Sequence, residues 1–162
     1  MSQNKVMSLE QVVVAADRLR SGGRRLVFTN GCFDLLHVGH VRYLQAARER
    51  GDALLVAVNG DVSVRELKGP ERPINTESDR AEVLAALGCV DLVTLFHTPR
   101  ATEVIRAVRP ALYVKGGDYT VASLDPDEYG AIQEVGAEVE ILALVPGKST
   151  TAVVRKLVGA RC

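Results

Sequence analysis

Two histidines three residues apart follow a short apolar run and a turn that contains a glycine. His37 and His40 are expected to share one face of the first turn of a helix, where free backbone N–H groups and the helix dipole favour an anion. Gly39 removes a side chain between them and would let a phosphate come close, and Gly31 gives the preceding turn similar freedom. Two imidazoles there can stabilise charge that develops on phosphate oxygens. The spacing favours this interpretation over a pair of buried histidines bonded to backbone groups.

Polar side chains also follow the later apolar runs. Asn59 and Asp61 would either contact a sugar or phosphate or serve as ordinary turn residues. Lys68 and Arg72 lie in the stretch KGPERP, which composition alone assigns to a solvated charged loop, although a mobile loop of this kind can clamp phosphates. Asp34 could approach a magnesium ion on a nucleotide, but we favour helix capping or the orientation of a histidine.

Two more loops have residue types suited to phosphate. In VKGGDY the glycines would let the backbone approach a ligand, so that Lys115 and Asp118 contact phosphate and ribose or base; the alternative is a simple strand-end turn around Gly117. Hydroxyl side chains then open the last expected helix: Ser149, Thr150 and Thr151. Such a start can bind an anion, although helix capping alone also selects serine and threonine.

Short apolar runs alternate with helix-like segments along the whole chain. The expected strands are 26–29, 53–58, 90–96, 111–115 and 138–144. The expected helices are 8–20, a helix from the histidine turn to about residue 50, 77–87, 101–108, 127–135 and 149–158. This alternation predicts an α/β fold, a Rossmann-like, doubly wound, five-stranded parallel sheet. Ligands of such sheets bind beyond the carboxyl ends of the strands, where the polar loops lie.

Composition narrows the class of protein. The 162 residues suit a single domain, with an N-terminal helix and turn at 1–23 and the main α/β unit at 24–162. A net charge of zero argues against nucleic acid or an anionic membrane as a partner. The three cysteines are irregularly spaced, which favours free thiols in the cytoplasm over a disulfide framework or a metal site. No apolar run approaches the length of a membrane span.

The motifs together resemble a known group of enzymes. LVFTNGCFDLLHVGH is similar to the signature of the HxGH nucleotidyltransferase superfamily, and the resemblance covers about residues 24–158. KGPERP, VKGGDY and STT resemble the D-glycero-β-D-manno-heptose 1-phosphate adenylyltransferase family, whose activity is in many bacteria the C-terminal half of a bifunctional heptose kinase. This chain looks like a standalone version. Lys148 differs from the residue expected in that family before STT.

The resemblance implies transfer of AMP from ATP, with Mg²⁺, to the heptose phosphate, in a homodimer or larger assembly. It assigns catalysis to His37, His40 and Lys68. Nucleotide or phosphate binding is assigned to Asn30, Gly31, Cys32, Phe33, Gly39, Arg72, Lys115, Gly117, Asp118, Ser149, Thr150 and Thr151. Asp34, Asn59 and Asp61 are assigned to substrate binding, and no residue to a dedicated metal site. The alternatives are the same reaction on glycerol 3-phosphate with CTP, or on a flavin or pantetheine phosphate, and a non-catalytic nucleotide-binding regulator.

Overall fold

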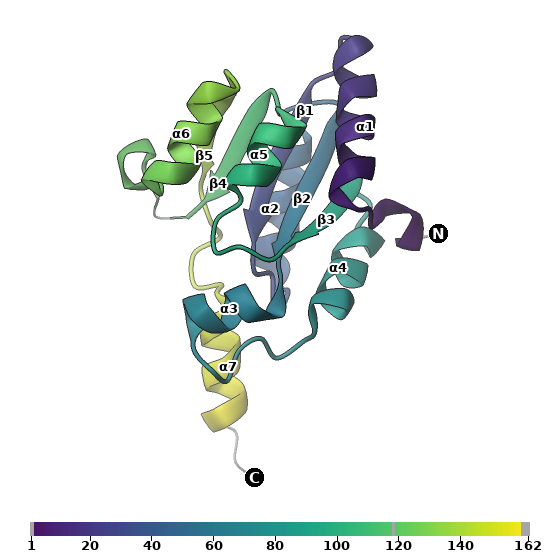
Figure 1. The fold of residues 1–162 in the computed structure, drawn as a ribbon. Helices are drawn as coiled ribbons and strands as arrows, with labels where there is room; N and C mark the ends of the chain where they lie inside the picture. The colour runs from purple at the N-terminus through teal and green to yellow at the C-terminus, as the bar shows by residue number, and fades with distance from the viewer. Residues whose placement is uncertain (1, 118, 160–162) are drawn as a thin grey trace.

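The computed structural model describes residues 2–117 and 119–159, and its centre is a five-stranded parallel sheet (Figure 1). The strands are β1 (Leu26–Gly31), β2 (Ala53–Asn59), β3 (Leu92–Phe96), β4 (Leu112–Gly116) and β5 (Glu138–Leu142). Their order across the sheet is β3-β2-β1-β4-β5. The chain adds β2 and β3 on one side of β1 and then crosses over to add β4 and β5 on the other side. The expected doubly wound fold is therefore confirmed.

Helices cover both faces of the sheet. They are α1 (Leu9–Ser21), α2 (Val38–Arg48), α3 (Asp61–Lys68), α4 (Glu77–Ala86), α5 (Thr102–Val108), α6 (Pro126–Glu134) and α7 (Thr150–Gly159). Short 3-10 helices at Ser2–Lys5 (η1) and Val121–Ser123 (η2) complete the described elements. Each of these helices falls short of the length and hydrophobicity that a bilayer-spanning segment requires.

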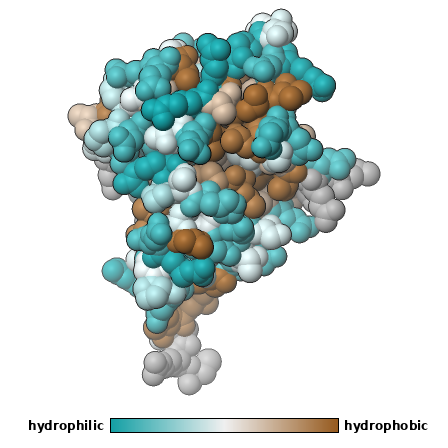
Figure 2. All heavy atoms as spheres, viewed as in Figure 1, coloured by the Kyte–Doolittle hydropathy of each residue, from teal (hydrophilic) through white to brown (hydrophobic). Residues whose placement is uncertain are grey.

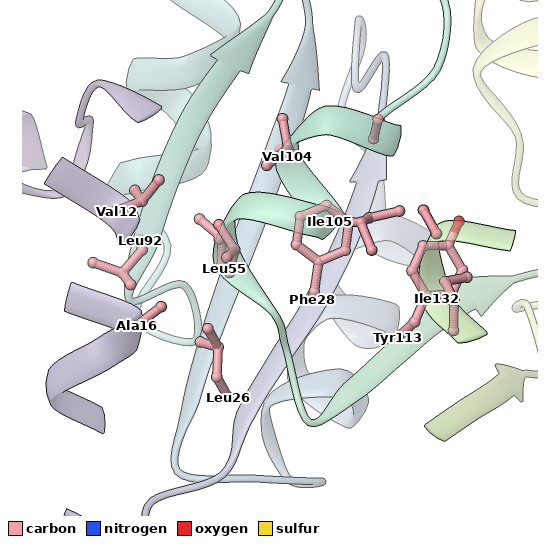
Figure 3. Close-up of a cluster of buried hydrophobic side chains, with 14 of the residues drawn as sticks. Val12, Ala16, Leu26, Phe28, Leu55, Leu92, Val104, Ile105, Tyr113 and Ile132 are labelled. Atoms are coloured by element: carbon pink, nitrogen blue, oxygen red, sulfur yellow. The ribbon is translucent and has the colours of Figure 1, made fainter. Parts of the chain in front are cut away.

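Alternate residues of the central strands supply two separate cores. Leu26 and Phe28 of β1 pack with α1, α5 and α6 in a cluster that includes Ile105 (Figure 3). Val27, their neighbour in sequence, belongs to the opposite cluster with α2 and α4, where Leu44 is fully buried. Because successive side chains of a strand point to opposite faces, strands covered on both sides must be apolar throughout, as these are.

The sequence-based boundaries are wrong in one segment. We expected a turn and then a mobile polar stretch after β2, but Asp61–Lys68 form helix α3. Ser63 and Val64 are both fully buried while the residues that follow them in the helix are exposed, so the helix depends on tertiary burial that a short segment with four charged residues in eight does not reveal. Gly69, at a φ of 104°, ends it.

The C-terminal helix α7 extends away from the sheet (Figure 1). Apolar side chains appear on this extension in the space-filling view, and Leu157 and Val158 are among the most exposed large apolar residues of the described chain (Figure 2). Its N-terminal end nevertheless contacts the loop that follows the central strand β1, because the Thr150 hydroxyl donates to the Leu35 carbonyl, 3.2 Å away. The expected helix start thus lies next to the histidine turn.

Candidate active site

A cleft of about 710 Å³ opens beyond the carboxyl ends of the strands, at the point between β1 and β4 where the strand order reverses. Most of the predicted site residues line it: Asn30, Gly31, Cys32, Phe33, Asp34, His40, Asn59, Lys68, Arg72, Lys115, Thr150 and Thr151. Five others are placed beside it and do not form its wall: His37, Gly39, Asp61, Gly117 and Ser149. Asp118 lies outside the described residues.

The two histidines cap the start of α2 reciprocally. His37 is the N-cap residue, and its Nδ1 accepts from the backbone N–H of Gly39 at 3.1 Å. The Nδ1 of His40 accepts from the backbone N–H of His37 at 3.3 Å. A neutral imidazole that accepts at Nδ1 carries its proton at Nε2, so both rings keep an Nε2–H donor. The ring centroids are 4.0 Å apart.

Both imidazoles are held in the neutral form. Burial, and then the nearby His37 ring, lower the pKa of His40 to about 4. Burial, and then the charge of Lys148, lower the pKa of His37. Phe33 packs edge-on to the His40 ring with centroids 5.7 Å apart. This aromatic cover explains how His40 lines the cleft and is still largely withdrawn from water.

Gly39 also leaves space for the ring of His37. A Cβ atom at this position would lie 2.8 Å from Nδ1 of the His37 ring and 3.2 Å from the Cβ of Lys148. The missing side chain therefore makes room for the capping imidazole. The freedom of the preceding turn also lies elsewhere than at Gly31, because Phe33 is the residue with a left-handed φ, 47°.

Asp34 does not cap the helix, because His37 is the N-cap residue of α2. Its buried carboxylate accepts from the Nε of Arg72 at 2.6 Å and from the backbone N–H groups of Ile74 and Asn75 at 2.8 and 2.9 Å. Burial alone would raise the pKa of Asp34, but these amides and the guanidinium outweigh it and hold the pKa below its usual value. Asp34 thereby fixes the segment that brings Arg72 to the cleft.

A buried arginine ties the same segment to the loop that follows β1. Arg80 of α4 is 2% exposed. It donates to the carbonyl of Cys32 at 2.6 Å, to the carbonyl of Asn75 at 3.1 Å and to the Asp61 carboxylate at 2.8 Å. Asp61, a predicted substrate ligand, is thus an ion-pair partner of Arg80 beside the cleft.

The other predicted side chains give the cleft a cationic side. Lys68, at the end of α3, lines the cleft with Arg72. Lys115 of β4 also lines the cleft, and its ammonium lies 5.2 Å from the centroid of the Tyr119 ring. Asn59 is buried and donates to the Ser63 hydroxyl at 3.3 Å. Burial raises the pKa of the Cys32 thiol, which keeps it protonated and poorly suited to nucleophilic chemistry.

The hydroxyl residues at the start of α7 divide their roles. Ser149 caps the helix, since its Oγ accepts from the N–H of Ala152 at 3.0 Å. Thr150 and Thr151 line the cleft. Thr150 is further tied to the histidine turn through its bond to the Leu35 carbonyl. Helix capping therefore applies to Ser149, while phosphate binding by Thr150 and Thr151 stays a prediction.

Sequence reasoning missed the part of the cleft wall that helix α6 and the segment before α5 form. Glu128 of α6 and Arg100, which precedes α5, both line it. Arg100 donates to Asp125 at 2.5 Å, and that hydrogen bond, with the charges of Asp125 and Glu128, raises the pKa of its guanidinium. Tyr113 of β4 contacts Glu128 from below. An acidic residue in an amphipathic helix gives no sign in sequence that it is buried, so this wall had no recognisable pattern.

The chemistry available in the cleft is electrostatic. The neutral imidazole of His40, the two threonines at the start of α7 and the cationic side chains of Lys68, Arg72 and Lys115 all line it. Groups of these kinds stabilise phosphate oxygens. Within residues 2–117 and 119–159, no cluster of three or more His, Cys, Asp or Glu side chains could hold a metal ion. The arrangement suits the displacement of a phosphate group by positioning and charge stabilisation.

Comparison with known proteins agrees with this geometry. Residues 28–155 match the cytidylyltransferase-like family. The chain is 47% identical over 156 residues to the bifunctional protein HldE of Geotalea uraniireducens, and 49% identical over 158 residues to HldE of Pseudomonas syringae pv. syringae. These matches cover 96% and 98% of this chain but 31% and 33% of the relatives, so the chain spans about a third of the length of the curated relatives it matches.

Two solved structures share the fold. The lipopolysaccharide core biosynthesis protein of Thermoplasma volcanium is 31% identical, with a TM-score of 0.62 over 76% of this chain and 98% of its own. Pantoate-beta-alanine ligase of Francisella tularensis is 11% identical, with a TM-score of 0.55 over 85% of this chain and 66% of its own, which shows likeness of fold alone. The family match covers the strands, the histidine turn and the start of α7. The chain is a nucleotidyltransferase, and it belongs to the cytidylyltransferase-like family.

Proposed function

We propose that this enzyme transfers AMP from ATP to D-glycero-β-D-manno-heptose 1-phosphate and releases pyrophosphate. The observation that carries the proposal is the reciprocal cap of His37 and His40, which leaves an Nε2–H donor on the neutral ring of His40 in a cleft that Lys68 and Arg72 also line. The choice of heptose rests on the resemblance of KGPERP, VKGGDY and STT to the heptose 1-phosphate adenylyltransferases, and on the HldE relatives.

In the proposed reaction an oxygen of the sugar phosphate attacks the α-phosphorus of ATP in line. The new bond joins that oxygen to the α-phosphorus, and the bond from the α-phosphorus to the β-phosphate oxygen breaks. The nucleophile is already an anion, so no general base is needed. His40 donates to the oxygens on which charge grows, while Lys68 and Arg72 hold the triphosphate.

Magnesium enters this proposal as part of the ATP substrate. The Asp34 carboxylate already accepts from Arg72 and two backbone N–H groups, so we do not assign it to the ion. Phosphate oxygens supply the ligands that Mg²⁺ prefers, together with water. We further propose a cytoplasmic location and a homodimer or larger assembly, which sedimentation of the purified protein would test.

Pyrophosphate release across pairs of nucleotides and phosphorylated acceptors tests the proposal. ATP and CTP are each combined with heptose 1-phosphate, glycerol 3-phosphate and pantetheine phosphate. We expect the highest kcat/KM with ATP and heptose 1-phosphate. Turnover only with CTP and glycerol 3-phosphate would replace the assignment by the cytidylyltransferase alternative, which the family description favours.

A further inference from the structure

A buried polar trio lies where the cleft meets the sheet. Asn30 ends β1, Tyr113 lies in β4, and Glu128 projects from α6; all three are at most 9% exposed. The Tyr113 hydroxyl lies 3.0 Å from Oδ1 of Asn30 and 3.2 Å from Oε2 of Glu128. The Asn30 amide donates to Oε1 of Glu128 at 3.2 Å, and the backbone N–H of Ala101 donates to the same oxygen at 3.0 Å.

These contacts leave the trio one proton short. A tyrosine hydroxyl has a single hydrogen, yet two acceptor oxygens compete for the one on Tyr113. Among the hydrogen bonds of the described residues, neither Oδ1 of Asn30 nor Oε2 of Glu128 has another donor. Whichever oxygen takes the proton, the other is left without one. Both residues line the cleft, and a buried acceptor without a donor is costly.

The charge of this wall selects the kind of donor. Arg100, the cation of this wall, is already paired with Asp125, and the remaining carboxyl group of Glu128 does not attract an anion, so a phosphate group is better placed beside Lys68, Arg72 and Lys115. A hydroxyl group donates its hydrogen without bringing negative charge. A molecule that carries both a phosphate and hydroxyl groups would satisfy the two walls together.

We propose that Asn30 and Glu128 together accept a hydrogen bond from one hydroxyl group of the phosphorylated polyol. Glu128 thereby determines which acceptor substrate the enzyme uses. This inference rests on the proposed function, because it assigns the polyol to the acceptor substrate and leaves ATP to the phosphate-binding side. Buried groups placed to pair with a substrate hydroxyl discriminate strongly against analogues that lack it.

Glu128→Gln tests the assignment with little change of shape. The amide puts a donor where the carboxylate offered an acceptor, so kcat/KM for the phosphorylated acceptor should fall about tenfold to a hundredfold. The KM for ATP should stay within about twofold, which a merely structural role in the cleft would not ensure. Glu134→Gln is the matched control, because Glu134 lies on the same helix with its carboxylate paired to the exposed Arg106.

Deoxy analogues of the acceptor give a readout that folding defects do not imitate. The wild-type enzyme should discriminate against one mono-deoxy analogue, and Glu128→Gln should lose that discrimination. Tyr113→Phe removes the contested proton but keeps both acceptor oxygens, so it should retain the discrimination even if its melting temperature falls. Equal discrimination in wild type and Glu128→Gln, or an effect confined to the KM for ATP, would overturn the proposal.

The experiments can distinguish a failure of this inference from a failure of the proposed function. If the wild type prefers glycerol 3-phosphate, deoxy analogues of that acceptor replace those of the heptose. Loss of discrimination in Glu128→Gln would then support the hydroxyl reading while the heptose assignment fails. If heptose 1-phosphate is the substrate and no deoxy analogue is discriminated against, the hydroxyl reading fails while the heptose assignment stands.

Discussion

The Nδ1 atom of His40 accepts a hydrogen bond from the backbone N–H of His37, 3.3 Å away. This bond satisfies an N–H at the helix start and also leaves the proton of a neutral imidazole on the opposite nitrogen. The residue pair thus sets both the local backbone and the donor that faces the cleft. In the proposed reaction these histidines act as neutral hydrogen-bond donors, which separates this site from one that binds phosphate through imidazolium charge.

The ligand-free protein should show an unusually acidic His40. NMR titration of the ring protons should give a pKa of about 4, because burial and the adjacent His37 ring oppose protonation. The unfolded chain titrates near the ordinary value of 6.5 and binds protons first as the pH falls, so the free energy of unfolding should decrease between pH 6.5 and 4. A His40→Gln variant should lose this part of the decrease. A titration of His40 near 6.5 would contradict the account.

Gly39→Ala should impair catalysis through the histidine it displaces. The added Cβ would lie 2.8 Å from the His37 ring, so the ring must move and its bond to the Gly39 N–H must break. We expect kcat to fall at least about tenfold, the scale of losing one hydrogen bond that acts in the transition state.

Gly130→Ala is the matched control for this substitution. Gly130 lies inside helix α6 with no atom near its added Cβ, so the change should stabilise the protein by about 0.5–1 kcal/mol and leave kcat unchanged. Comparable kcat values for both alanine variants would show that the His37 ring position is unimportant.

Arg80→Ala should destabilise the fold strongly. The substitution leaves the Asp61 carboxylate and the carbonyls of Cys32 and Asn75 without their shared donor, and we expect a loss of about 3–5 kcal/mol in the free energy of unfolding. Arg106→Ala, which breaks the exposed pair with Glu134, should cost no more than about 1 kcal/mol. Urea denaturation of both variants measures the difference, and equal midpoints would refute the role given to Arg80.

The sheet and the histidine turn could be predicted because their patterns are local. Buried strands such as 53–58 are apolar throughout, and the spacing of His37 and His40 alone predicts that they share a helix turn. Helix α3 could not be predicted, since its stability comes from the packing of Val64 against distant residues.

The misassigned site residues have a common physical cause. Asp34 and Arg80 are charged residues that each have a partner far away in sequence, Arg72 for Asp34 and Cys32 for Arg80. No local pattern distinguishes such a buried anchor from a ligand-binding side chain. Glu128 escaped notice for the same reason, because its contacts come from β1, β4 and the segment before α5.

The rate of adenylyl transfer by His40→Ala, at saturating ATP and acceptor, tests the central claim most directly. Removal of the neutral Nε2–H donor should lower kcat at least about a hundredfold. The lost cap at the start of α2 should cost only about 1 kcal/mol in the free energy of unfolding, so the variant stays folded at the assay temperature. A kcat within about twofold of the wild-type value would contradict the account.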